Sequence, residues 1–469
     1  MSVVLPKKAH CIGVGGIHVS AVAKLLIARG VTVSGSDAFE NDETKDLAAR
    51  GAVISIGHHV SNLPIDAGVV IYSHAVPPEN AELAEAKRRG IQCVDTHAFL
   101  AWMFGGAQQI VVTGSHGKST TTSMLGLILA SCGVNPTVIV GTKVPGFVDG
   151  NLRIGREDLL IVEGDEYQRH VLSYQPTVLV LNNVELDHVD VYPTIEAYEQ
   201  VFREVVKKMG EGTVVVVNAD DVRAHAIGAF ARAEKKSLVE VGMNAGDVHI
   251  GKIESRDGGS SVDMHLSGDV IVPFDLNVPG EMNVRNAAMA LAGARAAVPT
   301  MDLERAYDAL AAFKGCWRRF ERIGEVNGAV AVSDYGHHPT EVRATLAAAH
   351  EAFPDRRIVL AFQPHHRNRT KHLFSEFVAS FDGADVLMLV EIYDVPGREA
   401  TEDANVSSSQ LMDAVKQRDV ERGKQRPISF VPSVSDLAQA ISSAGVTEQD
   451  VILFMGAGAI DAEARKMVN

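Results

Sequence analysis

The strongest chemical signal in the sequence is a lysine that follows a glycine-flanked turn, within the run IVVTGSHGKSTTT at residues 110–122. The β-branched start predicts a strand, and an apolar-periodic helix from Met124 to Cys132 follows the turn. This order of strand, loop and helix is typical of phosphate binding, because the loop and the helix N-terminus both present N–H groups to an anion. Lys118 would then reach the outer phosphates of a nucleotide, and the Ser119 hydroxyl would bind Mg²⁺.

The loop is a variant of the usual P-loop pattern. That pattern places a glycine where this chain has Val112. A purely structural strand-to-helix turn is therefore the alternative. The loop residues that we expect to contact the phosphates are Gly114, Ser115, His116, Gly117, Lys118, Ser119 and Thr120.

Carboxylates follow the next hydrophobic strand, which spans residues 158–162. Glu163, Asp165 and Glu166 come directly after it and predict a Mg²⁺ site that faces the phosphates, with a solvated acidic turn as the alternative. The strand at 177–181 ends in NNVELDHVD, which suits a site better than a core. His188 in that run is a candidate second metal ligand, or else a surface histidine.

The first hundred residues alternate short strands and helices around a Gly15-Gly16 turn. This is typical of a doubly wound nucleotide-binding sheet. The dinucleotide fingerprint requires a third glycine where the chain has His18, which counts against a NAD-dependent oxidoreductase. Ligands bind at the carboxyl ends of parallel strands, so a diphosphate or nucleotide-linked ligand would face one crevice lined by Gly15, His18, Asp37, Ser73 and His74.

The third part of the chain holds the densest basic cluster, QPHHRNRT at residues 363–370, at the end of a predicted strand. It suits a carboxylate or a γ-phosphate, and a solvated loop is the alternative. Before it, Arg319 and the run DYGHHP at 334–339 lead into a helix that Pro339 opens. A helix over Glu281–Ala297 carries Asn283 and Asn286 on one face, where they would read an adenine edge or cap the helix.

Composition limits the classes of function. The 469 residues allow two to four domains, and 46% hydrophobic and 22% charged residues are ordinary for a globular chain. A net charge of −15 argues against nucleic-acid binding. The sequence has no apolar run of membrane-spanning length and no signal-peptide core, so we expect no membrane insertion and a cytoplasmic protein. The four cysteines are scattered, which predicts free thiols.

Ten motifs together resemble the Mur ligases, the ATP-dependent amino-acid ligases of peptidoglycan precursor synthesis. The resemblance runs through the whole chain in order. The motifs are VGGIH at 14–18, YSHAVPPEN at 72–80, TGSHGKSTTT at 113–122, EGDE at 163–166, NNVELDH at 182–188, NVRNAAMA at 283–290, RRF at 318–320, DYGHHP at 334–339, QPH at 363–365 and GAG at 456–458.

The resemblance implies an α/β fold of three domains. Residues 1–105 would form a Rossmann-like domain for a UDP-sugar, and residues 106–314 a P-loop ATPase-like domain with a mixed sheet for ATP and Mg²⁺. Residues 315–469 would form a second Rossmann-like α/β domain for the incoming amino acid. We expect a monomer or a homodimer.

The family's site roles carry over by position. Lys118 and His188 would be catalytic, and Ser119, Glu163 and His188 would hold metal. Beyond the loop, the ATP-binding residues would be Asn283, Asn286, Arg319, Asp334 and His337. The UDP-sugar-binding residues would be Gly15, Gly16, His18, Ser20, Asp37, Ser73 and His74. The amino-acid-binding residues would be His365, His366 and Arg369.

Within the family, the motifs are most similar to those of the members that add L-alanine to UDP-N-acetylmuramate through an acyl phosphate. Two departures fall where the acceptor binds. His366, Arg367 and Asn368 replace the usual RYT of the basic motif, and EGDEY resembles the ligase that reattaches a recycled tripeptide. Addition of a tripeptide is therefore the alternative within the family. Outside the family, the residues also allow a P-loop NTPase without ligase activity and a noncatalytic UDP-sugar-binding protein.

Overall fold

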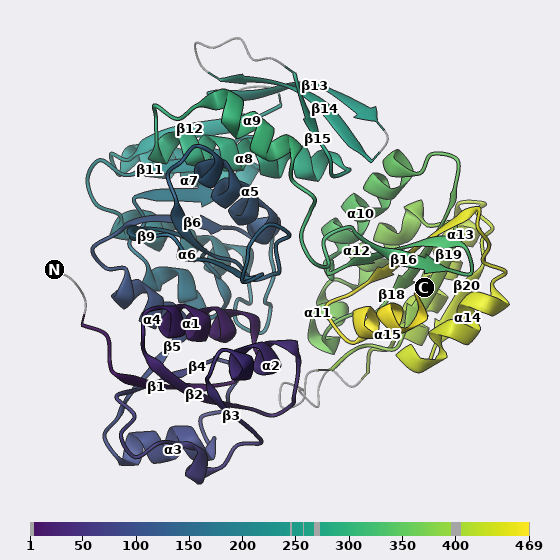
Figure 1. Cartoon of the computed structure of the whole chain (residues 1–469). Coiled ribbons are helices and arrows are strands. Elements are labelled where there is room, and N and C mark those ends of the chain that lie inside the picture. The colour runs from purple at the N-terminus through teal and green to yellow at the C-terminus, as the bar shows by residue number, and fades with distance from the viewer. Residues whose placement is uncertain (1–3, 244–245, 257, 267–272, 395–404, 469) are drawn as a thin grey trace.

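The computed structural model describes residues 4–243, 246–256, 258–266, 273–394 and 405–468. Three sheets follow one another along the chain, and helices cover them (Figure 1). This confirms the predicted α/β architecture of three domains. None of the helices in the described ranges has both the length and the apolar character that a membrane span requires.

The first sheet has the strand order β3-β2-β1-β4-β5, and all its pairs are parallel. The Gly15-Gly16 turn ends at helix α1, which begins at Ile17 and not at Val19 as the apolar pattern predicts. The elements are β1 (Lys8–Ile12), α1 (Ile17–Ala28), β2 (Thr32–Asp37), α2 (Asp42–Ala49), β3 (Val53–Ile56), β4 (Val69–Tyr72), α3 (Ala81–Arg88), β5 (Gln92–Asp95) and α4 (Thr96–Met103).

The second sheet is mixed, with the order β15-β14-β13-β12-β11-β10-β6-β9-β7-β8. Its central strands are parallel, and antiparallel pairs close both ends. The elements are β6 (Gln108–Thr113), α5 (Lys118–Ser131), β7 (Pro136–Ile139), β8 (Leu152–Arg153), β9 (Arg156–Glu163), β10 (Val178–Leu181), α6 (Ile195–Lys208), β11 (Val214–Asn218), α7 (Val222–Ala233), β12 (Ser237–Gly242), β13 (Val248–Arg256), β14 (Gly259–Leu266), β15 (Phe274–Leu276), α8 (Glu281–Ala297) and α9 (Leu303–Ala311).

The third sheet has the order β16-β17-β21-β18-β19-β20, and only the β16–β17 pair is antiparallel among its described strands. The elements are β16 (Glu321–Val326), β17 (Ala329–Asp334), α10 (Pro339–Ala352), β18 (Arg357–Phe362), α11 (Arg367–His372), α12 (Phe374–Ser380), β19 (Val386–Val390), α13 (Ser408–Glu421), β20 (Ile428–Val431), α14 (Leu437–Ser443), β21 (Asp450–Met455) and α15 (Ile460–Met467).

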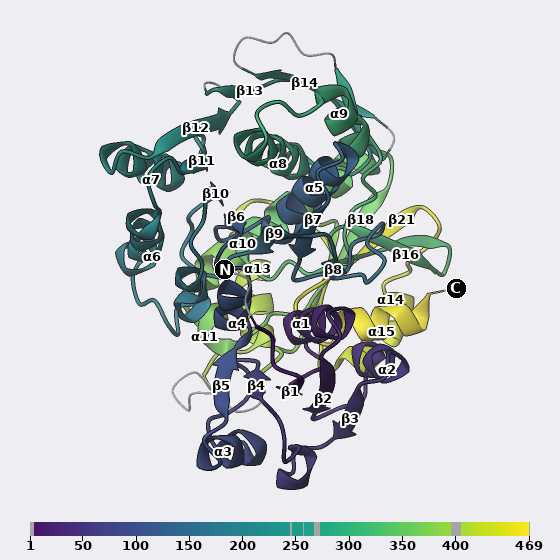
Figure 2. The ribbon, with the colours of Figure 1, turned by 60° about the vertical axis from the view of Figure 1, so that its left-hand side comes forward.

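The hydrophobic cores divide differently from the sheets. One cluster of buried side chains runs from the first sheet into the second, and it includes Phe99 and Phe104 at α4 with Val171 and Tyr174. The third sheet has a separate cluster on each face. In Figure 2, α1 and α4 lie directly below the second sheet, which agrees with the shared core.

Candidate active site

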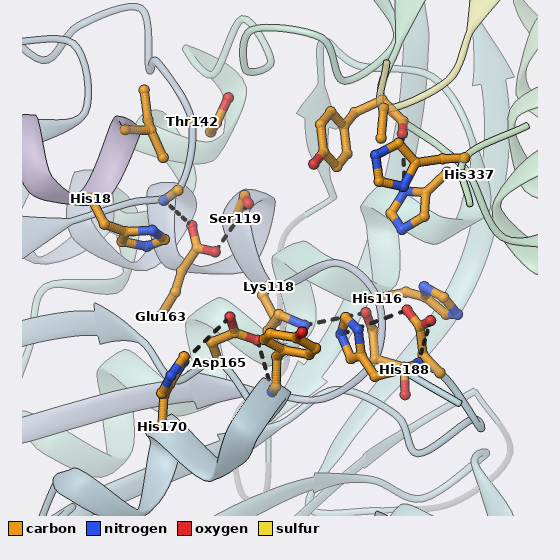
Figure 3. Close-up of a pocket in the computed structure, with 18 of the residues that line it drawn as sticks. His18, His116, Lys118, Ser119, Thr142, Glu163, Asp165, His170, His188 and His337 are labelled. Carbon is orange, nitrogen blue, oxygen red and sulfur yellow. Dashed lines mark hydrogen bonds and ion pairs between the residues drawn. The ribbon is translucent and has the colours of Figure 1, made fainter. Parts of the chain in front are cut away.

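One cavity of about 620 Å³ lies where the three domains meet (Figure 3). Its lining combines the carboxyl ends of β6 and β9, the N-terminus of α1 and the loops around α10 and α11. The predicted site residues that line it are Gly16, His18, Ser73, His74, Ser115, His116, Gly117, Lys118, Ser119, Glu163, His188, Arg319, His337, His365, His366 and Arg369.

The phosphate loop connects β6 to α5. Gly114 and Gly117 have φ values of 120° and 78°, a region that favours glycine, and α5 begins at Lys118, six residues before the helix start expected from apolar periodicity. The Lys118 Nζ donates to the Gly114 carbonyl at 2.6 Å and to both oxygens of the buried Glu166 carboxylate at 3.0 Å. Burial opposes the charge on this lysine, but the nearby carboxylates outweigh it and raise its pKa.

Ser119 and Glu163 form the first candidate metal position. The Ser119 hydroxyl donates to Glu163 Oε2 at 3.1 Å, and Glu163 Oε1 accepts the Gly141 N–H at 2.6 Å. Both side chains are almost fully buried. A hydroxyl and a carboxylate at this separation beside a phosphate loop suit Mg²⁺, which prefers oxygen ligands.

His188 lies on the other side of Lys118. Its backbone is left-handed, with φ at 52°, and Asp165, Glu166 and His188 offer ligand atoms within 4.8 Å of one another. Burial opposes protonation of His188, but Asp187 and Glu166 outweigh it and raise its pKa. Lys118, Glu163 and His188 therefore share one cavity, as the sequence hypothesis requires.

The C-terminal domain contributes a buried ion pair. Two guanidinium nitrogens of Arg369, Nε and Nη2, donate to Asp187 Oδ1 at 3.0 and 2.8 Å. Asp187 is deeply buried, yet Arg369 holds its pKa well below the usual value. Next to this pair, burial lowers the pKa of His337 to about 3 and that of His365 to about 2, helped in both cases by the positive charge of Arg369.

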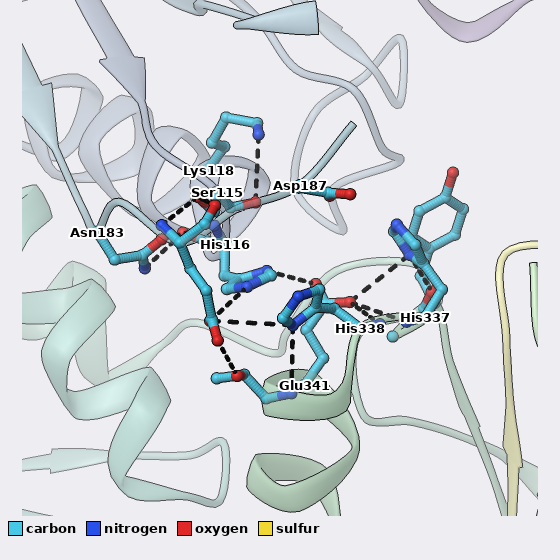
Figure 4. Close-up of polar contacts among 12 residues, drawn as sticks. Ser115, His116, Lys118, Asn183, Asp187, His337, His338 and Glu341 are labelled. Atoms are coloured by element: carbon cyan, nitrogen blue, oxygen red, sulfur yellow. Dashed lines mark hydrogen bonds and ion pairs between the residues drawn. The ribbon is translucent and has the colours of Figure 1, made fainter. Parts of the chain in front are cut away.

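His116 joins the central and C-terminal domains (Figure 4). Its Nε2 lies 3.1 Å from Glu185 Oε2, and its Nδ1 lies 3.2 Å from Glu341 Oε1 on α10. Burial disfavours the imidazolium, but the Glu341 and Glu185 carboxylates outweigh it and raise the pKa of His116 to about 10. His116 is therefore a largely buried cation between two carboxylates at neutral pH.

The residues expected at the adenine and ribose lie behind the cavity lining. Asn283 donates to the Pro279 carbonyl at 2.7 Å, and Asn286 Oδ1 accepts from Thr121 at 3.3 Å. A Cβ on Gly117 would lie 2.3 Å from Asn286 Oδ1, so this amide packs on the phosphate loop. The Asp334 carboxylate accepts the N–H groups of Phe320 and Gly336. In this geometry, these side chains hold the loops in place.

The predicted UDP-sugar residues fall into two groups. Gly16, His18, Ser73 and His74 line the cavity. The others serve the local structure, because Gly15 donates its N–H to Asp37 at 2.8 Å and the buried Ser20 hydroxyl donates to the Ile17 carbonyl.

The side chains in or beside the cavity that were not predicted from the sequence include His97, His170, His338 and Glu341. His338 and Glu341 form a capping box at the start of α10, but histidine stands where the sequence pattern has serine or threonine, so only Pro339 marked this helix start. His97 lies in the apolar stretch THAFLAWM and resembles a core residue, so nothing local identified it.

A lysine-bearing phosphate loop in the middle of three α/β domains, with side chains from all three around one cavity, defines a multidomain nucleotide-binding enzyme. Three family models match successive parts of the chain: the Mur ligase family catalytic domain at residues 8–107, the Mur ligase middle domain at 112–294 and the Mur ligase glutamate ligase domain at 318–458. The chain belongs to the Mur ligase family and is an ATP-dependent ligase.

Curated relatives and solved structures agree with this assignment. The UDP-N-acetylmuramate–L-alanine ligase of Salinibacter ruber is 37% identical over 97% of this chain and 93% of its own length. That of Geobacter sulfurreducens is 36% identical over 97% and 95%. The crystal structure of a UDP-N-acetylmuramate-alanine ligase from Thermotoga maritima matches with a TM-score of 0.81, at 26% identity over 98% of both chains. A murein peptide ligase from Psychrobacter arcticus shares the fold, with a TM-score of 0.70 at 23% identity over 98% of both chains.

Proposed function

We propose that this protein joins L-alanine to the lactyl carboxylate of UDP-N-acetylmuramate, with ATP as the energy source. The observation that carries the proposal is that Lys118, Glu163 and His188 open into the same cavity as Arg369 of the C-terminal domain. The full-length relatives named for this reaction support the same assignment.

We assign one substrate to each domain. The UDP-sugar would bind residues 1–105, ATP residues 106–314 and alanine residues 315–469. The nucleotide, the nucleotide-linked sugar and the free amino acid fit a cytoplasmic reaction, and the monomer or homodimer stays a prediction. In this arrangement, the lactyl carboxylate, the γ-phosphate and the amino group of alanine converge on the single cavity.

The side chains around the loop suit the first step. The lactyl oxygen attacks the γ-phosphorus, ADP leaves and an acyl phosphate forms. Both reactants are anions, so Lys118 would neutralise the γ-phosphate once the nucleotide draws it away from Glu166. Ser119, Glu163 and His188, with Asp165 and Glu166 beside them, are the residues that would hold Mg²⁺. Bound Mg²⁺ would supply charge neutralisation and orientation of the reacting oxygens.

The C-terminal domain suits the second step. The amino group of alanine loses a proton, attacks the acyl carbon and displaces phosphate, leaving an amide. The Arg369 Nη1 donates to the His365 carbonyl at 3.4 Å and makes no bond to Asp187, so we assign its second N–H to the alanine carboxylate. Burial lowers the pKa of His365 to about 2, so this imidazole is neutral beside the proposed alanine site.

A second candidate function is ligation of a tripeptide to the same sugar. The observation that favours it is local. Arg367 stands where the alanine-adding members usually have tyrosine, and it pairs with Asp394 at 2.7 Å, so the loop that would bind the acceptor differs from theirs.

The test is an assay of ADP release by the purified protein. We expect release only when UDP-N-acetylmuramate and L-alanine are both present. Glycine, L-serine and the tripeptide are tried in place of alanine, and preference for the tripeptide would replace the main proposal by the second. Phosphate release without sugar or amino acid would identify a P-loop NTPase and overturn both.

A further inference from the structure

Four imidazoles gather at the end of the cavity between the N-terminal and central domains, around Asp165. His18 lies on α1, His74 follows β4, His97 lies on α4, and His170 lies in the turn after β9. The ring centroids of His97 and His170 are 4.7 Å apart, those of His74 and His170 4.0 Å, and those of His18 and His97 5.4 Å. We call these five residues the imidazole cluster.

Four of the eight ring nitrogens in the imidazole cluster are buried without a hydrogen-bond partner: both nitrogens of His170 and Nε2 of His18 and His74. Two of the four face a carboxylate beyond hydrogen-bond distance, because His170 Nδ1 lies 3.9 Å from Asp165 and His74 Nε2 lies 3.8 Å from Asp95. His97 uses Nδ1 for the Tyr174 hydroxyl at 3.0 Å, which leaves its Nε2 available. Buried polar atoms without partners destabilise the folded state, so a cluster of them points to a ligand.

We propose that the imidazole cluster binds a transition-metal ion of the Zn²⁺ class, held by His97, His170 and Asp165, with His74 as the fourth ligand. Ligand atoms of the first three already lie within 4.8 Å of one another. Ligands of one tetrahedral Zn²⁺ lie about 3.4 Å apart at Zn–N distances near 2.1 Å, so small side-chain rotations close the site.

The donor set separates this site from the Mg²⁺ position. Mg²⁺ prefers oxygen ligands, whereas several imidazoles with one carboxylate favour Zn²⁺ and its neighbours. Asp165 Oδ2 lies 3.9 Å from His170 Nδ1, and Asp165 also belongs to the group with Glu166 and His188. Figure 3 shows Asp165 between His170 and Lys118, so the proposed ion is next to the reaction centre but on its UDP-sugar side.

A metal here would connect two domains. His74 and His97 come from the N-terminal domain, and Asp165 and His170 come from the central domain. One ion bound to all four would fix the mouth of the predicted UDP-sugar site. The inference depends on the arrangement of these side chains and not on the proposed ligase activity.

The test is a Zn²⁺ titration of the metal-free full-length protein by calorimetry, in a large excess of Mg²⁺ that fills the oxygen sites. We expect one equivalent of Zn²⁺ to bind the wild type. His170→Gln and His97→Asn should each weaken binding by at least about 10-fold. The matched control is His249→Gln, because His249 also stacks on a second imidazole, His265, at 5.8 Å, but far from the cavity.

Two further measurements need no variant. Co²⁺ in place of Zn²⁺ should give the intense visible absorption of a four-coordinate site, whereas weak six-coordinate bands would overturn the proposal. Zn²⁺ should also raise the melting temperature of the wild type by several degrees in Mg²⁺, since it binds only the folded state. No binding in excess Mg²⁺, or binding that is unchanged in both cluster variants, would overturn the site. Neither result bears on ADP release, which is measured separately.

Discussion

The cavity is bounded by two junctions between domains, one between the N-terminal and central domains and one between the central and C-terminal domains. At the first, a single hydrophobic cluster passes from α4 into the central domain and includes Phe99, Phe104 and Tyr174. A buried ion pair, Lys24 with Glu43 at 2.7 Å, reinforces it, and the same Lys24 nitrogen donates to Asn151 of the central domain.

The second junction consists of charged and polar contacts. His116 lies between Glu185 and Glu341, the Thr340 hydroxyl donates to Glu185 at 2.6 Å, and Arg369 pairs with Asp187. The described apolar clusters of the third sheet contain only residues of the C-terminal domain. Directional polar contacts break and re-form more easily than a shared core.

The contrast between the apolar first junction and the polar second junction is clearest in their histidines, because both junctions contain buried or largely buried imidazoles. His97 at the first junction is surrounded by other imidazoles, and burial lowers its pKa to about 3, so it stays neutral. His116 at the second is surrounded by carboxylates and stays charged. We therefore expect the first junction to be rigid and the second to open and close around the reaction.

The largest expected effect is at Lys118, which lies between the two junctions. Lys118→Ala should reduce ligation by about 10³-fold, because it removes the cation that neutralises the γ-phosphate. Binding of UDP-N-acetylmuramate, measured by calorimetry, should change less than about twofold, since the first junction keeps its core. Lys45→Ala, an exposed lysine paired with Glu40, is the control. Loss of both activity and sugar binding would contradict the division of labour between the domains.

The second prediction concerns the stability of the polar junction. His116→Ala leaves Glu185 and Glu341 facing each other without the cation, and we expect a loss of about 3 kcal/mol in the free energy of unfolding. Urea denaturation checks this value. The control is His225→Ala, which removes an exposed imidazole that lies 3.0 Å from Glu240 and should cost less than about 1 kcal/mol. Equal losses in the two variants would show that the junction gains nothing from burial of its charges.

The third prediction is a pH dependence confined to the same junction. The pKa of His116 rises from 6.5 to about 10 on folding. Its contribution to the free energy of unfolding is therefore complete below pH 6.5 and is lost as the pH rises through 10. The pKa of Glu185 falls from 4.5 to about 2 on folding. Its contribution to the free energy of unfolding is therefore present above pH 4.5 and is lost as the pH falls through 2. Glu341 faces the same imidazole, and the His338 ring lies 4.8 Å away.

The measurement for this prediction is the difference in melting temperature between the wild type and His116→Asn across the pH range. We expect the wild-type advantage to be largest between about pH 4.5 and 6.5 and to decline steadily toward about pH 10. An advantage that is constant from about pH 6 to 10 would mean that His116 is not held as a cation.

Patterns that repeat locally made most of the fold predictable. The apolar period of α8 gave its bounds, Glu281–Ala297, and β-branched runs located the parallel strands such as β10. The phosphate loop was predictable because its chemistry requires glycine and lysine in adjacent positions. Helix starts were less accurate: α5 begins at Lys118, because its first turn of serine and threonine has no apolar period.

The sequence predicted His18 and His74 in one crevice and Asp165 at a metal site, but it did not predict that His97 and His170 join them, because these residues come from distant parts of the chain. His97 resembles a core residue, and His170 lies in an irregular turn in which Gln168 and Arg169 have positive φ. The hydrogen bonds of Asp334 were also not predictable, since the sequence does not show that two backbone N–H groups donate to its carboxylate. The identity of a side chain is visible in a sequence, but its partners depend on the packing of three domains.

The smallest expected effect separates the two duties of Arg369 at the polar junction. Nε and Nη2 donate to Asp187 and Nη1 donates to the His365 carbonyl, and under the proposed function the second N–H of Nη1 would bind the alanine carboxylate. Arg369→Lys keeps the positive charge and one contact to Asp187, but a single ammonium cannot serve both carboxylates in fork geometry. We expect the KM for alanine to rise about 10-fold, which corresponds to the loss of one charged hydrogen bond, and kcat to stay within about twofold.

The control for this variant is Arg343→Lys, because Arg343 is an exposed arginine of α10 at the same junction whose guanidinium donates to Thr340 at 3.0 Å. Its kinetic constants should stay close to those of the wild type. A fall in kcat with an unchanged KM in Arg369→Lys would instead assign Arg369 to the positioning of Asp187 and its neighbour His188. The C-terminal domain would then contribute to catalysis by organising the metal side of the cavity, and the alanine carboxylate would bind elsewhere along α11.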